Sequence, residues 1–221
     1  MEKVFIIGSS GHAQVIIDMI RMESKYSIQG LFDDFIQIEE YRYSLPILGG
    51  VSAISAPQYA ANSISLVVAI GDNHQRHLVV KKIADLNASC QYPPVIHPKA
   101  TLSPNSSVGN GTVIMAGAII NPGACIGSHC IINTNSVIEH DVKIGDFSSI
   151  GPSATIAGGC SIGNETAICA GATVIEKIEI GDFTVIGAGS VVTRNITSQV
   201  IAFGSPARPV KARDPSSKYL K

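Results

Sequence analysis

The sequence predicts a mainly β protein: a left-handed parallel β-helix built from hexapeptide repeats, preceded by a small Rossmann-like βαβ domain. Two observations lead to this fold. An aliphatic residue recurs at every sixth position in the second half of the chain, whereas the first half shows buried strands that end in polar or glycine turns. We therefore expect residues 1–95 to form the βαβ domain, 96–194 the β-helix and 195–221 a C-terminal tail.

The hexapeptide repeat runs without a slip from Ile96 to Val192. All 17 positions reached by steps of six residues hold Ile, Leu or Val. The place four residues later usually holds a small side chain, such as Ala118, Cys130 or Ser136. A helix of 3.6 residues per turn cannot keep a period of six on one face, whereas a triangular prism with one strand and one corner per hexad can. Three hexads complete a coil, so the segment predicts about five coils.

The composition limits the classes of function. The 221 residues carry a net charge of −1 with 15% charged residues, which does not favour nucleic acid or an anionic membrane as the main partner. No apolar run approaches the roughly 18 residues of a membrane span, and the N-terminus turns polar too soon for a signal peptide. Cys130 and Cys160 fall where the repeat places small buried residues. We therefore expect unpaired core thiols and a cytoplasmic protein.

The N-terminal segment alternates strands, turns and helices. Expected strands at residues 3–7, 28–32 and 66–70 each end in a polar or glycine turn, and expected helices follow the first strand and cover about 74–86. Such a turn aims backbone N–H groups and a helix N-terminus at a phosphate. The first turn is not GxGxxG, so a nucleotide sugar is favoured over NAD. The alternative is that the glycines only permit a tight turn.

Candidate nucleotide-sugar contacts follow from this arrangement. They stand at the turns after the three strands, where a ligand of a parallel sheet binds. The residues are Gly8, Ser10, Gly11, His12, Asp33, Asp34, Gly71 and Asn73.

His140 is the candidate catalytic base. It follows Ile138 by two places, at the exit from a strand toward a corner, where its side chain can point out of the aliphatic core. Histidine accepts a proton near neutral pH, and a neighbouring carboxylate can orient its ring. Asp141 and Glu139 flank His140, and the sequence does not decide which of them supports it.

Two glycines stack beside His140 on the next coil. Adding one coil of 18 residues to His140 and Asp141 leads to Gly158 and Gly159. Residues without a Cβ atom leave room for a ligand beside the ring and expose backbone N–H groups. We expect the N–H of Gly158 to donate to an oxyanion that forms beside His140. Glycines that serve only the turn are the alternative.

Several motifs together resemble one family. They are the turn G-S-S-G-H-A at 8–13, the strand ending I-G-D-N at 70–73, I-N-T at 132–134, V-I-E-H-D at 137–141 and G-S-P-A at 204–207. With the hexads, they make essentially the whole chain similar to the NeuD/PglD-type sugar acyltransferases. The resemblance implies acetyl-CoA as acyl donor, no metal, and a homotrimer with active sites between subunits.

The resemblance also implies roles for particular residues. His140 is the base, Asp141 supports it, and Asn133 and Thr134 contact the substrate. Relatives often have a second histidine in the next hexad, where this chain has Ser148 and Ser149. The residues expected to contact CoA are Gly158, Gly159, Gly171, Ala188, Pro206, Ala207 and Arg208, with Lys211 and Arg213 completing a basic cluster for its phosphates.

The function predicted is N-acetylation of a nucleotide-linked 4-amino-4,6-dideoxy sugar used for surface glycans. O-acetylation of the sialic acid type is the nearest alternative, and a non-catalytic scaffold is the alternative from another class. A zinc lyase needs three converging histidines, but His129 and His140 occupy different hexad positions and only His97 accompanies them in the repeat. His74 and His77 lie on an expected helix and are expected to be structural or solvated.

Overall fold

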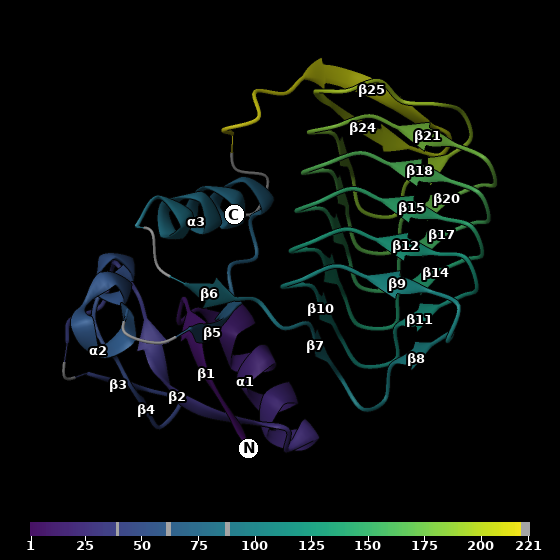
Figure 1. Ribbon diagram of the computed structural model, residues 1–221. Coiled ribbons are helices and arrows are strands. Elements are labelled where there is room, and N and C mark those ends of the chain that lie inside the picture. The colour runs from purple at the N-terminus through teal and green to yellow at the C-terminus, as the bar shows by residue number, and fades with distance from the viewer. Residues whose placement is uncertain (39, 61–62, 87–88, 218–221) are drawn as a thin grey trace.

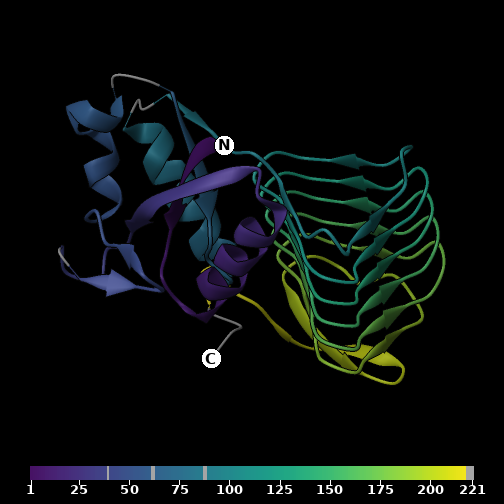
Figure 2. The ribbon, with the colours of Figure 1, turned by 90° about the horizontal axis from the view of Figure 1, so that it is seen from below.

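The computed structural model describes residues 1–38, 40–60, 63–86 and 89–217. It has the two parts that the sequence predicts, an N-terminal domain around a parallel sheet and a three-sided left-handed parallel β-helix (Figures 1 and 2). Within the described ranges, no helix is long and apolar enough to cross a membrane.

The N-terminal domain is a four-stranded parallel sheet in the order β2-β1-β5-β6. Its main helices, α1 (Gly11–Glu23) and α3 (Asn73–Asp85), follow the strands as predicted. The remaining elements are β1 (Glu2–Ile7), β2 (Tyr26–Phe32), the hairpin β3 (Tyr41–Arg42) and β4 (Leu45–Pro46), the 3₁₀ helix η1 (Val51–Ser55), α2 (Pro57–Ala60), β5 (Ile64–Val68) and β6 (Cys90–Gln91).

The β-helix has three flat faces made of two-residue strands, one strand per hexad. Face 1 contains β7 (Val95–Ile96), β10 (Val113–Ile114), β13 (Ile131–Ile132), β16 (Ser149–Ile150), β19 (Ala167–Ile168) and β22 (Val185–Ile186). Face 2 contains β8 (Thr101–Leu102), β11 (Ile119–Ile120), β14 (Val137–Ile138), β17 (Thr155–Ile156), β20 (Thr173–Val174) and β23 (Val191–Val192). Face 3 contains β9 (Ser107–Val108), β12 (Cys125–Ile126), β15 (Lys143–Ile144), β18 (Ser161–Ile162) and β21 (Glu179–Ile180). The first two faces each have six of these strands, so the coils number nearer six than the five expected.

The interior of the prism is a ladder of aliphatic side chains. The second residue of each strand points inward, and successive coils place like on like, as in the parallel pairs of Ile132 with Ile114 and Ile150. Burying each such side chain contributes roughly 1.5–3 kcal/mol. Cys130 and Cys160 are unpaired and buried in this core, as predicted, and burial raises the pKa of the Cys130 thiol to about 12.

The N-terminal domain packs against face 1 and leaves faces 2 and 3 turned away from it. Val95, Val113 and Ile131 on face 1 share a hydrophobic cluster with Ile16 and Ile20 of α1. Figures 1 and 2 show α1 and α3 on this side of the prism and β8, β11 and β14 on the far side.

The end of the chain closes the prism with a hairpin. β24 (Val200–Gly204) adds to face 1 beside β22, and β25 (Ala207–Ala212) folds back antiparallel to it. Arg213 then turns inward, where its guanidinium donates to the Phe183 carbonyl oxygen at 2.8 Å. We expected Arg213 in a basic cluster on CoA, but the buried side chain anchors the hairpin instead.

Candidate active site

His140 lies at the corner between faces 2 and 3, which we call the His140 corner (residues 121–123, 139–141 and 157–159). The chain leaves β14 at Ile138 and turns at Asp141, whose φ is 60°. The carbonyl oxygen of His140 accepts a hydrogen bond from the Gly159 N–H at 2.9 Å, and Asp141 N–H donates to the Pro122 oxygen at 3.1 Å. Neighbouring coils therefore hold the backbone, while the imidazole side chain points outward and is 64% exposed.

Asp141, rather than Glu139, contacts the imidazole. Its Oδ2 lies 2.9 Å from His140 Nδ1, whereas Glu139 Oε2 accepts a hydrogen bond from Asn121 Nδ2 at 3.0 Å. A carboxylate at Nδ1 favours the tautomer with its proton on Nδ1, which leaves Nε2 able to accept a proton. Of the two carboxylates that flank His140, Asp141 is therefore the one placed to orient its ring.

Gly158 lies directly against the ring of His140. A Cβ atom built on Gly158 would stand 2.5 Å from His140 Nε2, so any side chain there would displace the imidazole. Gly158 is the third residue of its hexad, and the N–H at this place does not take part in the backbone hydrogen bonds between coils. Proline, which has no N–H, stands at the same place at 98, 104, 122 and 152. The N–H of Gly158 thus takes no part in the backbone bonds between coils, in a residue that lies against His140 Nε2.

The N-terminal domain contains a cavity of about 490 Å³ at the carboxyl ends of β1, β2 and β5. Six residues expected at a nucleotide-sugar site line it: Gly8, Ser10, His12, Asp33, Asp34 and Gly71. Gly8 has a φ of +97°, and a Cβ there would approach the Ala69 carbonyl oxygen to 3.1 Å, so the turn requires glycine. Of the other two, Gly11 does not line the cavity, and Asn73 is buried against the β-helix with its amide on the Thr166 oxygen.

The two aspartates are held in different ways. Asp33 accepts hydrogen bonds from Ser9 Oγ at 2.6 Å and from Phe35 N–H at 2.9 Å. Burial alone would raise the pKa of Asp34, but hydrogen bonds from Lys82 and Val51 outweigh it and hold this pKa below its ordinary value. Both carboxylates are therefore fixed acceptors in the cavity wall.

His12 is a neutral polar group in the same wall. Burial, together with the charge of Arg76, lowers its pKa to about 4. Its Nε2 is shielded from solvent and has no hydrogen-bond partner within the part of the chain that the structure describes. A buried polar atom in this state is suited to a hydrogen bond with a ligand.

Sequence reasoning missed other parts of this wall. Ser9, Phe35, Asp72 and Gln75 also line the cavity, and Phe35 is 98% exposed at its rim. Tyr43 donates to the carbonyl oxygens of Ser9 and Ser10 at 3.1 and 3.0 Å and so fixes the first turn. Phe35 follows Asp33 and Asp34 directly, which was the one available signal; nothing in the sequence pointed to Tyr43.

Four of the remaining expected contacts lie at a second corner. Asn133, Thr134, Gly171 and Ala188 stand between faces 1 and 2, at what we call the Asn133 corner (residues 115–117, 133–135, 151–153, 169–171 and 187–189). Pro206, Ala207 and Arg208 belong to the β24–β25 hairpin, where Ala207 is buried and the other two are exposed. One chain therefore does not bring all the expected site residues together.

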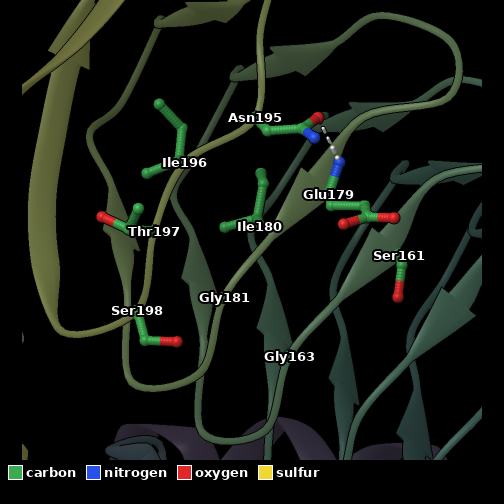
Figure 3. A pocket seen from close by; sticks show the side chains of 9 residues that line it. All are labelled: Ser161, Gly163, Glu179, Ile180, Gly181, Asn195, Ile196, Thr197 and Ser198. Carbon is green, nitrogen blue, oxygen red and sulfur yellow. Dashed lines mark hydrogen bonds between the residues drawn. The ribbon is translucent and has the colours of Figure 1, made fainter.

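A second cavity of about 510 Å³ lies on face 3, on coils beyond His140 (Figure 3). It forms where the segment 195–198 runs beside β21, with Asn195 Oδ1 accepting from the Glu179 N–H at 2.9 Å. Its lining is Ser161, Gly163, Glu179, Ile180, Gly181, Asn195, Ile196, Thr197 and Ser198. Glu179 is the one titratable side chain among these nine, so the cavity offers no acid–base pair.

The histidines of α3 are structural, as expected. The carboxylate of Glu165, which is buried on the β-helix, forms hydrogen bonds with His74 Nδ1 at 3.0 Å and with His77 Nδ1 at 2.5 Å. Over the described ranges, no group of three or more His, Cys, Asp or Glu side chains is arranged to hold a metal ion.

Comparison with known proteins follows the same division of the chain. The PglD N-terminal domain family matches residues 3–83, and the bacterial transferase hexapeptide family matches 105–140, 126–158 and 141–176. A curated relative, UDP-N-acetylbacillosamine N-acetyltransferase of Bacillus subtilis strain 168, is 35% identical over 123 residues. That match covers 52% of each protein, so it spans about half the length of the curated relative.

Solved structures match the chain over nearly its whole length. PerB from Caulobacter crescentus, solved with CoA and GDP-perosamine, is 34% identical, with a TM-score of 0.87 over 96% of this chain and 98% of PerB. The acetyltransferase domain of PglB from Neisseria gonorrhoeae, solved with acetyl coenzyme A, is 27% identical, with a TM-score of 0.84 over 95% and 99%. The chain therefore belongs to the hexapeptide-repeat sugar N-acetyltransferase family with a PglD-type N-terminal domain, a family of acyltransferases.

Proposed function

We propose that the protein transfers the acetyl group of acetyl-CoA to the amino group of a nucleotide-linked 4-amino-4,6-dideoxy sugar, a step in making surface glycans. The observation that carries this proposal is the exposed His140–Asp141 pair over Gly158, in a chain whose relatives are named sugar N-acetyltransferases. The N-terminal cavity supports the acceptor class, because it joins a glycine turn and the N-terminus of α1 to two fixed carboxylates.

The chemistry requires one base and one oxyanion donor. The sugar amine attacks the thioester carbon, and the carbonyl electrons move to oxygen, where the Gly158 N–H donates a hydrogen bond. His140 Nε2 accepts the proton that leaves the amine, and Asp141 stabilises the imidazolium. Collapse of the intermediate breaks the carbon–sulfur bond, and the leaving thiolate takes the proton back from His140. The products are the acetamido sugar and CoA, with His140 neutral again.

A trimer brings the separate residues together. The His140 corner and the Asn133 corner are the two edges of face 2. If face 2 of each prism turns toward a threefold axis, the His140 corner of one chain meets the Asn133 corner of the next. The N-terminal domain packs on face 1, and the Asn133 corner is one edge of that face, so in this arrangement we expect the cavity to serve His140 of the partner subunit.

The side chains of face 2 favour this arrangement. Its outward residues are Thr101, Ile119, Val137, Thr155, Thr173 and Val191, which are all uncharged. The equivalent residues of face 3 are Ser107, Cys125, Lys143, Ser161 and Glu179, which include two charges. Burying uncharged side chains between subunits avoids the cost of removing charges from water. Face 2 is therefore the face suited to an interface between copies.

The direct test is an acceptor panel. Thiol release from acetyl-CoA is measured with UDP-, GDP- and dTDP-linked 4-amino-4,6-dideoxy sugars, and the acetylated product is identified by mass spectrometry. We expect turnover with one nucleotide series. Turnover with sialic acid and no amine would replace the proposal by O-acetylation. An absence of CoA binding by calorimetry would favour a non-catalytic scaffold.

A further inference from the structure

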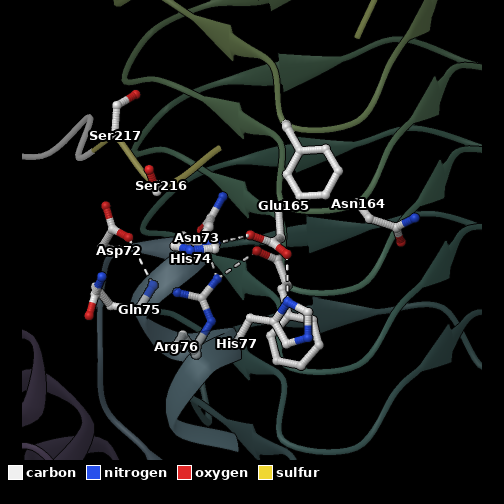
Figure 4. A network of polar contacts seen from close by, with 12 residues as sticks. Asp72, Asn73, His74, Gln75, Arg76, His77, Asn164, Glu165, Ser216 and Ser217 are labelled. Carbon is white, nitrogen blue, oxygen red and sulfur yellow. Dashed lines mark hydrogen bonds and ion pairs between the residues drawn. The ribbon is translucent and has the colours of Figure 1, made fainter. Parts of the chain in front are cut away.

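The first turns of α3 lie against a third corner of the prism, between faces 3 and 1. We call it the Phe147 corner and define it by His129, Phe147, Glu165 and Phe183, which follow one another up the coils with φ values of 48–57°. Figure 4 shows Asn73, His74, Arg76 and His77 of α3 facing this corner. The contacts between them are polar and closely matched.

Arg76 is at the centre of this contact and is 1% exposed. Its Nε donates to the His129 carbonyl oxygen at 2.8 Å, and one Nη2 bond goes to the Phe147 oxygen at 2.9 Å. Nη1 donates to the oxygens of Ile70 and Gly71 at 2.8 and 3.0 Å, and Nη2 also donates to Asn73 Oδ1 at 2.7 Å. These five bonds use every N–H of the guanidinium, which lysine could not reproduce.

Other side chains fix the orientation of the helix around Arg76. Glu165, 4% exposed, accepts from both His74 and His77. The His77 ring stacks on Phe147 with centroids 4.5 Å apart, and Phe147 stacks on His129 at 5.0 Å. The first turn of α3 is therefore fixed by the Glu165 carboxylate, by ring stacking on Phe147 and by the backbone oxygens that Arg76 binds.

The same segment forms a wall of the nucleotide-sugar cavity. Ile70, Gly71, Asp72 and Gln75 all line it, and Arg76 binds the carbonyl oxygens of the first two. One buried side chain thus joins the cavity wall to two coils of the β-helix. A shift of this contact would move the cavity relative to the prism.

We propose that Arg76 is a positioning residue for the acceptor, which fixes the cavity on the prism so that the sugar amine reaches His140 of the partner subunit at the right place. This inference rests on the function proposed above. Small displacements matter, because a misplacement of about 1 Å can reduce a rate about 100-fold. Binding of the nucleotide itself needs only the cavity wall and not its place on the prism.

The test compares Arg76→Lys and Arg76→Met with Lys81→Met, which removes an exposed cation from the same helix. UDP, GDP and dTDP are each titrated calorimetrically into the full-length parent and variants, and the stoichiometry counts intact cavities. Turnover is then expressed per intact cavity. We expect kcat to fall at least tenfold for both Arg76 variants, with the Kd of the nucleotide and the KM for acetyl-CoA changed less than threefold. Lys81→Met should match the parent.

Each other outcome has a distinct meaning. An unchanged kcat per cavity, or a nucleotide Kd weakened more than tenfold, would overturn the positioning role. Failure of both Arg76 variants to fold, seen by circular dichroism, would overturn it in favour of a role in stability. A parent that binds nucleotide and CoA but acetylates no amine would remove the proposed function instead. In that case, faster hydrogen exchange of residues 70–73 in Arg76→Lys would still support the contact, and unchanged exchange would contradict it.

Discussion

At the scale of single residues, the candidate site depends on glycine as much as on histidine. Gly158 holds the third place of its hexad, where Ala116, Ala170 and Ala188 stand in other coils, so the backbone there accepts alanine. Only at Gly158 would the added Cβ meet the His140 ring. The contact with His140 therefore distinguishes this place from the same place in other coils.

This contact predicts a defined effect of Gly158→Ala. The methyl group should displace the imidazole and lower kcat by about 100-fold, because the base and the oxyanion donor lose their alignment. The melting temperature should change by no more than a few degrees. Steady-state kinetics with calorimetry measures both, and a variant with near-parental kcat would show that Gly158 serves the turn alone.

Two histidines with lowered pKa values predict a pH-dependent stability. Burial, and then the charge of Arg76, lower the pKa of His12 and of His129 to about 4, although Asp146 partly opposes the shift at His129. Unfolded histidine titrates near 6.5, so between about pH 6.5 and 4 the unfolded chain binds protons that the folded chain does not. The free energy of unfolding should therefore be highest above pH 6.5 and fall as the pH drops toward 4.

Urea unfolding at pH 7.5, 6.5 and 5.5 tests this, in a range where most carboxylates stay ionised. We expect a loss of roughly 1–3 kcal/mol for the parent between the extremes, and a smaller loss for His129→Gln. Equal pH dependence in the two proteins would contradict the part assigned to His129.

At the scale of the element, the hexad could be recognised in the sequence because the residue types it needs are local and recur in every coil. An inward aliphatic residue, a small residue near the corner and a backbone that tolerates positive φ recur in each coil, so the sequence alone specified the prism and the stacking of Gly158 on His140. The contacts of α3 with the Phe147 corner could not be predicted from the sequence. They join residues more than 50 positions apart, through buried groups such as Arg76 and Glu165 that resemble surface residues in the sequence.

The inward and outward positions of the short strands predict that two similar substitutions lower the free energy of unfolding by different amounts. Ile150→Ala removes an inward side chain that is fully buried and should lower the free energy of unfolding by about 2–5 kcal/mol. Ile119→Ala removes an outward side chain of face 2 that is 38% exposed in the single chain and should cost the folded monomer much less. Urea unfolding of both variants, at concentrations where the oligomeric state is known, measures the difference; equal costs would contradict the assignment of inside and outside.

At the scale of the whole molecule, the expected site residues fall on two corners and in a separate domain. Six of the eight residues that the sequence placed at the turns after the strands line the cavity, because those residues follow strands directly. The sequence placed Asn73 in the cavity wall wrongly, since a polar residue after a strand can equally turn toward a packed neighbour, as Asn73 does toward Thr166. The proposal that a second copy brings these parts together rests on the positions of the corners around the prism.

The trimer proposal predicts that a charge on face 2 disrupts both assembly and activity. Val137→Arg places a cation on this face, and Ser107→Arg places one on face 3 as the matched control. Analytical ultracentrifugation should show smaller species for Val137→Arg only. The thiol-release assay should show lost acetyl transfer for the same variant only. A trimeric Val137→Arg variant would remove face 2 as the interface, and disruption by Ser107→Arg instead would assign face 3.

The role of His140 as the base is best measured by acetyl transfer by His140→Ala beside the parent and Asp141→Asn, on the sugar nucleotide that the acceptor panel identifies. We expect His140→Ala to lower kcat by about 100- to 10,000-fold, Asp141→Asn to lower it less, and the nucleotide and CoA affinities to stay within threefold. A His140→Ala variant whose kcat stays within threefold of the parent would contradict this role, because the proton of the amine would then leave by another route.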